Sequence, residues 1–276
     1  MAPPLFVVDG HNVMYRAWFG FPARITSRDK TRDLTGVFGF LALVRKAHLL
    51  RAPDSEMLVV FDGENATATR TNADPDYKAN RADADHSPIK SLPWIKQALD
   101  AIHVRWIELD DHEADDVIAS ATSHAVRRDR AVVCCSGDRD FYQMLDHPTV
   151  SILTPTRAEV AGVDVRRRFG VLPRQWPDYR ALTGDPADNI PGIRGVGPKT
   201  AAGLLADGWH LDDLKGSPRL RNARGAAVTE NWERLLVWRD LIRLQRNVAL
   251  PPDLITERMT PPLPLASKIL EQLDLW

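Results

Sequence analysis

Three short apolar segments, each followed by an aspartate, constrain the fold of this chain more than any other feature. They are Leu5 to Val8, Met57 to Phe61 and Ala131 to Cys135. Each is rich in β-branched or aromatic residues, as buried strands are. Stretches with apolar residues at helical spacing lie between them, at Val37 to Leu50 and Ala114 to Arg127. This alternation predicts an α/β fold with a mostly parallel central sheet and helices on both faces.

The aspartates that follow these segments are Asp9, Asp62 and, after a Ser-Gly turn, Asp138. Aspartate is common where strands turn, so one such residue would mean little. In open parallel sheets, however, ligands collect outside the carboxyl ends of the strands. Three acids at three strand ends therefore indicate a functional edge of the sheet.

Two further groups of acids lie outside the strands. DDHEADDVIAS, residues 110–120, holds Glu113, Asp115 and Asp116, and GDPADN holds Asp185 and Asp188. The first group could simply favour a helix N-terminus through the helix dipole, and the second could be a turn and cap. In a regular helix, residues 113 and 116 share a face that residue 115 does not. All three can serve one site only if they straddle the start of the helix.

Electrostatics favours metal ions at such a site. Two unit charges about 4 Å apart repel by about 4 kcal/mol at an effective dielectric constant near 20, so many carboxylates cannot share a pocket without cations. Because the donors are all oxygen atoms, Mg²⁺ or Mn²⁺ is expected rather than zinc or copper. Two such ions are the usual means of hydrolysing a phosphodiester. Asp138 and Asp140 of SGDRD would then be metal ligands at a strand end.

Composition places few limits on function. The chain has 276 residues, of which 44% are hydrophobic, and a net charge of −1. No apolar stretch approaches a membrane span of roughly 20 residues, and the N-terminus lacks the pattern of a signal peptide, so we expect a cytoplasmic protein without membrane contact. The cysteines Cys134 and Cys135 are adjacent, which favours buried thiols. Local basic clusters at 166–168 and 219–224 could bind nucleic acid or be solvated faces.

The organisation along the chain suggests two units. We expect an α/β core over residues 1–172 and a helical unit over 173–276, because strand signals fade beyond Pro173. Thr67 to Ser91 is polar and charged, with few large apolar residues. We expect this stretch to project from the core and to be mobile.

Several motifs together resemble the 5′-nuclease family, which includes bacterial flap endonucleases and the 5′→3′ exonuclease domain of DNA polymerase I. The motifs are VVDGHNVMYRAW, VVFDG, DYKANR, EADDVIAS, SGDRDFYQML and YRALTGDPADNIPGIRGVGPKTA. The resemblance spans about residues 5 to 250. It implies a PIN-like α/β core, a helical arch at about residues 67–98 and a helix-three-turn-helix subdomain.

The resemblance also implies roles for single residues. The first metal would be held by Asp9, Asp62, Glu113 and Asp115, with Asp115 shared and Asp116 close by. The second would be held by Asp138, Asp140 and Asp185, with Asp188 in its outer shell. Every acidic position of the family's pattern is filled in this sequence.

Further implied residues would contact DNA. Tyr77, Lys78 and Arg81 match the YKxxR motif of the arch, in which lysine and arginine contact the scissile phosphate. A lysine and an arginine three residues apart share a helix face, which suits gripping one phosphate. Tyr15 matches an aromatic residue that stacks on a base in some relatives, although a core tyrosine is the alternative.

The turn in GIRGVGPKTAAGLL resembles the family's helix-three-turn-helix element. Gly195, Gly197, Lys199 and Thr200 would face the backbone of duplex DNA, with a K⁺ ion at the turn. Two departures stand out: Thr69 replaces a frequent phenylalanine and Arg139 replaces a frequent lysine. The first puts the packing at the base of the arch in question.

The function implied is a structure-specific 5′ nuclease, both flap endonuclease and 5′→3′ exonuclease, active in primer removal and DNA repair. Its substrates would be DNA with 5′ flaps, nicks or free 5′ ends, including RNA-primed ends, and a DNA polymerase or ligase would be its protein partner. We expect a monomer. A noncatalytic DNA-junction binding protein would need gaps in the acidic set. A PIN-like ribonuclease would lack the arch motif and the hairpin.

Overall fold

The computed structural model describes residues 2–81, 84–154 and 158–276. Its centre is a six-stranded sheet in the order β3-β2-β1-β4-β5-β6. All neighbouring strands are parallel except β6, which runs antiparallel to β5 at the edge. The strands are β1 (Leu5–Asp9), β2 (Glu56–Asp62), β3 (Arg105–Leu109), β4 (Val132–Cys135), β5 (Val150–Leu153) and β6 (Glu159–Val160). The predicted α/β fold with a mostly parallel sheet is confirmed.

Alternation along β1 explains why helices cover both faces of the sheet, since successive strand side chains point to opposite sides. Phe6 and Val8 pack in one apolar cluster, and Leu5 and Val7 pack in the other. The first cluster contains residues of α1 (Gly10–Gly20), α2 (Thr35–Arg51), α4 (Leu92–Ala101) and α12 (Ala266–Gln272). The second contains residues of α5 (Ala114–Val126) and of the 3₁₀ segment Asp140–Asp146.

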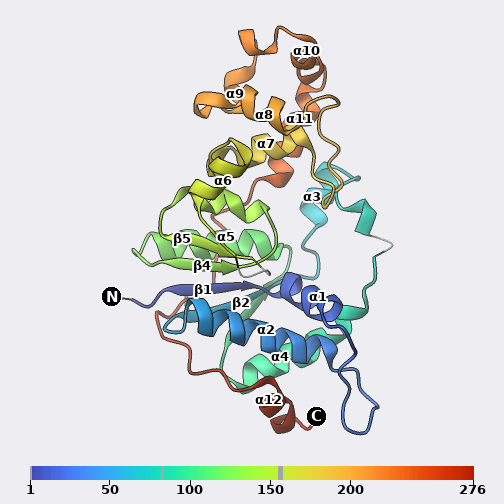
Figure 1. The fold of residues 1–276 in the computed structure, drawn as a ribbon, viewed down its shortest axis with the longest axis vertical. Coiled ribbons are helices and arrows are strands. Elements are labelled where there is room, and N and C mark those ends of the chain that lie inside the picture. The colour runs from blue at the N-terminus through green and yellow to red at the C-terminus, as the bar shows by residue number, and fades with distance from the viewer. Residues whose placement is uncertain (1, 82–83, 155–157) are drawn as a thin grey trace.

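A helical unit continues the second cluster beyond the sheet, in the upper part of Figure 1. Its helices are α6 (Gly162–Phe169), α7 (Trp176–Thr183), α8 (Pro198–Leu204), α9 (Leu211–Leu214), α10 (Ala223–Glu230) and α11 (Trp232–Ile242). The predicted extent of this unit, to residue 276, differs from the structure in one respect. Helix α12 leaves it and packs against α2 and α4 at the other end of the molecule, because Ile269 and Leu270 are buried in the first of the two apolar clusters.

The predicted strands and helices agree with β1, β2, β4, α2 and α5 to within a few residues. Strands β3, β5 and β6 and helix α1 were not predicted. Strand β3 is only half buried and its sequence RWIEL mixes polar with apolar residues, so it lacks the signature of a buried strand. Among the described residues, no helix is both long enough and apolar enough to cross a membrane.

The stretch predicted to project from the core is instead anchored at its base. It forms α3 (Ala68–Ala73) and short turns at Ala79–Arg81 and Ser87–Ser91 before α4 begins. Arg70 and Tyr77 are both buried, because they face the acidic edge of the sheet described below. Residues 68–81 are therefore anchored at Arg70 and Tyr77 and are otherwise mostly exposed, and the mobile arch stays a prediction. Residues 82 and 83, which it also included, lie outside the described residues.

Candidate active site

Asp9 and Asp62 lie at the carboxyl ends of adjacent strands. Asp9 is aligned with Val60 of β2, two residues before β2 ends at Asp62. The carboxylate of Asp9 accepts hydrogen bonds from the Ser136 hydroxyl at 2.7 Å and from the Asn12 amide at 3.1 Å. Because the second bond caps α1, the first strand-to-helix turn holds Asp9 in place. These hydrogen bonds therefore hold Asp9 at the predicted functional edge of the sheet.

The acids of EADD straddle a helix start, as their spacing required. Glu113 is the N-cap residue of α5 with extended backbone angles, and Asp115 and Asp116 lie in its first turn. The Ala114 amide donates to the Asp62 carboxylate at 2.7 Å, which ties this helix start to β2. Asp116 also accepts from the Gln245 amide at 2.7 Å. The three carboxyl groups can therefore serve one site.

Arg70 lies among these acids, and it was not predicted to be functional. Its guanidinium contacts Glu113 at 2.6 Å, Asp115 at 3.1 Å and Asp116 at 2.9 Å, and only 9% of its side chain is exposed. The available signal was its position next to Thr69, one of the two departures from the family's pattern. Thr69 itself is exposed, so the threonine that replaces the frequent phenylalanine does not alter the buried contacts of Arg70.

A second acidic group comes from the end of β4 and from the helical unit. Asp140 is 6% exposed and accepts from the Trp176 indole at 3.1 Å, while its amide donates to the Asp138 carboxylate at 2.8 Å. Asp185 pairs with Arg180 at 2.5 Å, and it is buried like Asp140. Carboxylates of the α/β core and of the helical unit therefore meet.

Burial raises the pKa of several of these carboxyl groups, because a charged form loses hydration. Burial first, and then the charges of Asp62 and Asp138, raise the pKa of Asp9 to about 7. Burial and Asp115 raise the pKa of Asp116 to about 7. Burial is also the main cause that raises the pKa of Asp188 to about 6, and it raises the pKa of Asp140, where Asp138 and Asp185 add to it. The ionised carboxyl groups repel one another, so the site favours bound cations.

The donor set fits hard divalent cations. Its donors are carboxylate oxygens, and one of them, Glu113 Oε1, is buried without a hydrogen-bond partner. Within the part of the chain that is described, no group of three or more His, Cys, Asp or Glu side chains converges closely enough to hold an ion. Glu113 is paired instead with Arg70 at 2.6 Å and with Lys78 at 2.5 Å. The chemistry of the ligands fits hard divalent cations, whereas in this structure Glu113 is paired with Arg70 and Lys78.

Lys78 and Arg81 face the acids from the other side. Lys78 Nζ lies 2.5 Å from Glu113 and 4.0 Å from Asp188, and Arg81 contacts Asp188 at 2.9 Å. The expected helix face shared by the two residues is wrong. Lys78 has a φ of 54°, and only the 3₁₀ turn Ala79–Arg81 follows it. Both cations reach the site because a tight turn, rather than a helix, presents them.

This turn is held by the loop that carries Asp185 and Asp188. The Lys78 amide donates to the Asp188 carbonyl at 3.0 Å, and the Asn80 side chain donates to the Pro186 carbonyl at 2.9 Å. In the opposite sense, the Asn189 side chain donates to the Asp76 carbonyl at 2.8 Å. We call residues 76–81 with residues 185–189 the clasp. It joins two motifs that sequence reasoning assigned to different units.

The two tyrosines differ in position. Tyr77 is 4% exposed, and its hydroxyl donates to Glu113 at 3.3 Å. It therefore helps to position Glu113 and is too buried for direct contact with DNA. Tyr15 is partly exposed on α1, with its hydroxyl 3.5 Å from His86 Nδ1. Its ring lies 6.3 Å from that of Phe19, which is 58% exposed. Tyr15 also packs against the apolar cluster that contains α1, α2 and α4, so stacking on a base stays a prediction beside a packing role.

The glycine-rich turn before α8 is exposed. Gly195 has a φ of 82°, which favours glycine, and an added Cβ there would meet no atom within 4 Å. Gly197 precedes α8, whose first turn contains Lys199 and Thr200. These two side chains line a surface hollow together with Arg219 and Arg224 from the predicted basic cluster. Two of the four predicted DNA contacts, Lys199 and Thr200, thus share a basic surface with that cluster.

The buried carboxylates lie at the end of a parallel sheet, with a lysine and an arginine in contact with them. This arrangement suits the binding of a phosphate ester. Residues 4–170 match the family described as 5′-3′ exonuclease, N-terminal resolvase-like domain. Residues 171–263 match the 5′-3′ exonuclease, C-terminal SAM fold. The chain therefore belongs to the 5′-3′ exonuclease family.

Similar curated proteins are DNA polymerases. The chain is 35% identical over 277 residues to a thermostable DNA polymerase I of Thermus filiformis, covering 99% of this chain and 32% of that protein. It is 37% identical over 259 residues to DNA polymerase I of Pseudomonas aeruginosa, covering 90% of this chain and 28% of that protein. The chain thus spans about a third of the length of these relatives.

Solved structures share the fold. A bacteriophage T5 protein co-crystallised with metal ions superposes with a TM-score of 0.68 at 21% identity, covering 97% of this chain and 98% of that one. The bacteriophage T5 flap endonuclease, in a complex with DNA and metal ions, gives 0.68 at 20% identity, covering 98% of this chain and 99% of that one. The predicted 5′-nuclease fold, with its α/β core and helical unit, is confirmed.

Proposed function

We propose that this chain is a structure-specific 5′ nuclease that hydrolyses DNA phosphodiesters at 5′ flaps, nicks and free 5′ ends, including RNA-primed ends. The observation that carries the proposal is the meeting of the two acidic groups beneath Lys78 and Arg81. Family membership and the T5 flap endonuclease complex with DNA and metal ions support it. The reaction expected of such a site is cleavage of a phosphodiester to leave a 5′ phosphate.

The residues divide into two metal-ligand sets. Asp9, Asp62, Glu113 and Asp115 would hold one divalent cation, with Asp116 beside them. Asp138, Asp140 and Asp185 would hold the other, with Asp188 farther out. Mg²⁺ or Mn²⁺ bound there would supply an activated water and charge stabilisation for the attacking and leaving oxygens. The raised pKa values of Asp9 and Asp116 fit this role, because a cation must replace the proton that each tends to keep.

Lys78 and Arg81 would orient the scissile phosphate. Both are held at the mouth of the acidic site by the clasp, with Lys78 only 14% exposed. With the neighbouring acids holding divalent cations, the ammonium group of Lys78 and the guanidinium group of Arg81 would be free to donate to the nonbridging phosphate oxygens. Charge-assisted hydrogen bonds of this kind gain strength as negative charge develops on the phosphate.

The remaining predicted residues would position DNA. The exposed turn at Gly195 and Gly197, with Lys199 and Thr200, would grip the backbone of the duplex, and a K⁺ ion at this turn is part of the proposal. Tyr15 would stack on a base near the cut, since exposed aromatic rings bind unpaired bases without regard to sequence. A DNA polymerase or ligase partner, a monomeric state and a cytoplasmic setting complete the proposal.

The test is denaturing-gel mapping of a 5′-flap duplex, labelled in turn at each end, with Mg²⁺, Mn²⁺ or EDTA. We expect metal-dependent cleavage near the flap junction. Asp138→Ala should abolish cleavage while junction binding in Ca²⁺ survives. Asp253→Ala is the matched control, because Asp253 is 85% exposed and outside the site. Tight flap binding by the unaltered protein without any cutting would favour a noncatalytic junction protein. Faster cutting of a matched single-stranded RNA would favour a ribonuclease.

A further inference from the structure

Residues 242–248, which we call the strap, begin at the last residue of α11 and reach the candidate active site. The Gln245 amide of the strap donates to Asp116 Oδ1 at 2.7 Å. The Arg70 guanidinium donates to the same oxygen at 2.9 Å. In the part of the chain that the structure describes, Asp116 Oδ2 accepts no hydrogen bond. Two donors therefore fix one oxygen of this buried carboxylate and leave the other available to a cation.

The start of the strap is held by the side chain of Gln143, which is only 3% exposed. Its Nε2 donates to the Ile242 carbonyl at 2.8 Å, and its Oε1 accepts from the Leu244 amide at 3.2 Å. One side-chain amide thus pairs with two backbone groups, as a neighbouring strand would. The next amide along the chain is that of Gln245. Gln143 therefore sets the position of the group that contacts Asp116.

The far end of the strap is held by α5 itself. Ser120 lies four residues after Asp116, so both side chains share one face of this helix. The buried Ser120 hydroxyl accepts from the Val248 amide at 3.0 Å and donates to the Gln245 carbonyl at 3.3 Å. Gln245 is thus bonded to α5 through both its amide and its carbonyl. The strap cannot shift along α5 without leaving buried polar groups unpaired, which is costly.

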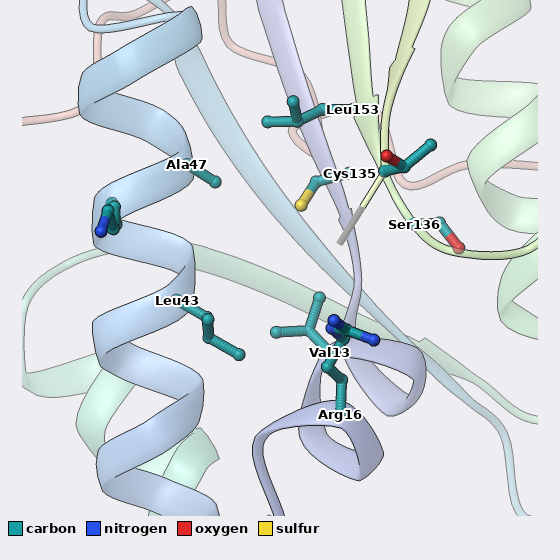
Figure 2. Close-up of a pocket in the computed structure, with 9 residues that line it drawn as sticks. Val13, Arg16, Leu43, Ala47, Cys135, Ser136 and Leu153 are labelled. Atoms are coloured by element: carbon teal, nitrogen blue, oxygen red, sulfur yellow. The ribbon is translucent and has the colours of Figure 1, made fainter. Parts of the chain in front are cut away.

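Asp9 has a supporting partner too, but a local one. The Ser136 hydroxyl donates to Asp9 at 2.7 Å and accepts from the Asp138 amide at 3.0 Å. Figure 2 shows the Ser136 side chain directed away from Leu43 and Cys135, which line an apolar cleft, so its hydroxyl serves the carboxylates instead. Asp116 receives the same support from a backbone amide, and the position of that amide depends on a side chain of another segment.

We propose that Gln143 is a positioning residue for the divalent-cation site. Through the strap it holds the Gln245 amide against Asp116 Oδ1, and this directs Oδ2 toward the first of the two proposed cations. The inference rests on the proposed function, because it concerns the metal ligands of that site. Gln143 itself contacts neither a cation nor DNA. Partners that orient a metal's carboxylate ligands typically change metal affinity by about 10- to 100-fold when they are removed, so weaker cation binding is the expected effect of its loss.

Binding of Mn²⁺ in the absence of DNA tests the proposal directly, with the free ion counted by electron paramagnetic resonance. Gln143→Met keeps nearly the length of the side chain but removes its amide group. We expect this variant to bind Mn²⁺ about tenfold more weakly than the unaltered chain. Unchanged affinity would overturn the proposal.

A matched pair of serine variants tests the other end of the strap. Ser120→Ala should weaken Mn²⁺ binding several-fold, because Gln245 loses its second bond to α5. Ser55→Ala is the control and should leave Mn²⁺ affinity unchanged. Ser55 is also buried and bonded to a backbone carbonyl, that of Ala52, but it lies before the amino end of β2, away from the acids. Equal effects of the two variants would contradict the role of the strap.

A rival path from Gln143 to the cations runs through Asp140, which begins the 3₁₀ segment that contains Gln143. A double-mutant cycle with Asp116→Ala separates the two paths. If the strap acts through Asp116, Gln143→Met should weaken Mn²⁺ binding by less than about twofold in a chain that already carries Asp116→Ala. A tenfold loss in both backgrounds would reject the proposal. Urea unfolding checks that each variant is folded, and the same cycle with Ser120→Ala decides the question should Gln143→Met fail to fold.

Flap cleavage separates positioning from a general loss of structure. Gln143→Met should need about tenfold more Mg²⁺ for its half-maximal rate, yet approach the unaltered rate at saturating Mg²⁺, with flap affinity in EDTA unchanged. A lower rate at saturating Mg²⁺ with an unchanged Mg²⁺ requirement would reject the proposal. If the unaltered chain binds Mn²⁺ but cuts no flap, the proposed function fails while the Mn²⁺ measurements still decide the role of Gln143. If the unaltered chain binds no Mn²⁺, the positioning role is overturned, and the cleavage assay decides the proposed function separately.

Discussion

Replacing Asp9 by asparagine should stabilise the metal-free protein at neutral pH while removing its catalytic activity. Asparagine keeps the shape of the side chain, and its oxygen can still accept from the Asn12 amide that caps α1. What it lacks is a charge at a buried position next to Asp62 and Asp138. The variant therefore isolates the energetic penalty of gathering carboxylates without cations.

The size of the effect follows from the pKa of Asp9. In the unfolded chain this carboxyl group ionises near its ordinary value of 3.8, whereas burial in the folded protein raises the pKa to about 7. The unfolded state therefore holds fewer protons between these values, and the free energy of unfolding falls as pH rises from about 4 to 7. The interval corresponds to roughly 4 kcal/mol. We expect Asp9→Asn to be more stable by about 2 to 4 kcal/mol at pH 8 and equal to the unaltered protein near pH 4.

Urea unfolding in EDTA at several pH values between 4 and 8, followed by tryptophan fluorescence, measures this difference. Millimolar Mg²⁺ should narrow it at pH 8, because the cation binds only the folded protein with an ionised Asp9. Asp253→Asn, at an exposed position, is the control, and its difference in stability from the unaltered protein should not change with pH. A stability difference that is the same at pH 5 and pH 8, or a variant less stable at both, would refute the reasoning.

Three further changes test other parts of the molecule. Arg70→Gln should lower the free energy of unfolding in EDTA by about 3–5 kcal/mol, because three carboxylates lose their buried cation, and Mg²⁺ should restore part of it; unaltered urea unfolding would contradict this. Lys199→Ala should weaken duplex binding and reduce the slope of log affinity against log salt by about 1, as measured by fluorescence anisotropy. An unchanged slope would remove Lys199 from the phosphate contacts. Asn189→Ala should speed hydrogen exchange at residues 76–81 and raise KM several-fold, with Ca²⁺ affinity unchanged as its control; unchanged exchange would show that the clasp does not order this turn.

The sheet edge could be predicted from the sequence because its signals are local. Strands β1, β2 and β4 are short apolar runs whose last residues or following turns are acidic, and parallel pairing brings their ends together without any further information. The straddled helix start at Glu113 also follows from spacing alone. In these places the local chemistry and the overall fold agree.

The surroundings of the acids could not be predicted, because they depend on contacts between distant segments. Arg70 reaches Glu113 across 43 positions of the chain, and Lys78 meets Asp188 across 110 positions. Neither pairing produces a periodic pattern in the sequence. Without knowledge of its partners, a polar stretch is therefore predicted to be mobile. The left-handed backbone at Lys78 likewise depends on its hydrogen bond to Asp188 rather than on its own preference.

Helix α7 explains how the helical unit can couple DNA binding to the active site. At its start the Trp176 indole donates to Asp140, and near its end Arg180 pairs with Asp185. The loop after Asp185 forms half of the clasp and then runs into the exposed turn, where the Ile193 amide donates back to the Leu182 carbonyl at 2.9 Å. A duplex held at that turn is thus joined by a few rigid contacts to the carboxylates of the second acidic group and to Lys78. We expect binding of the duplex and alignment of the phosphate to be one event.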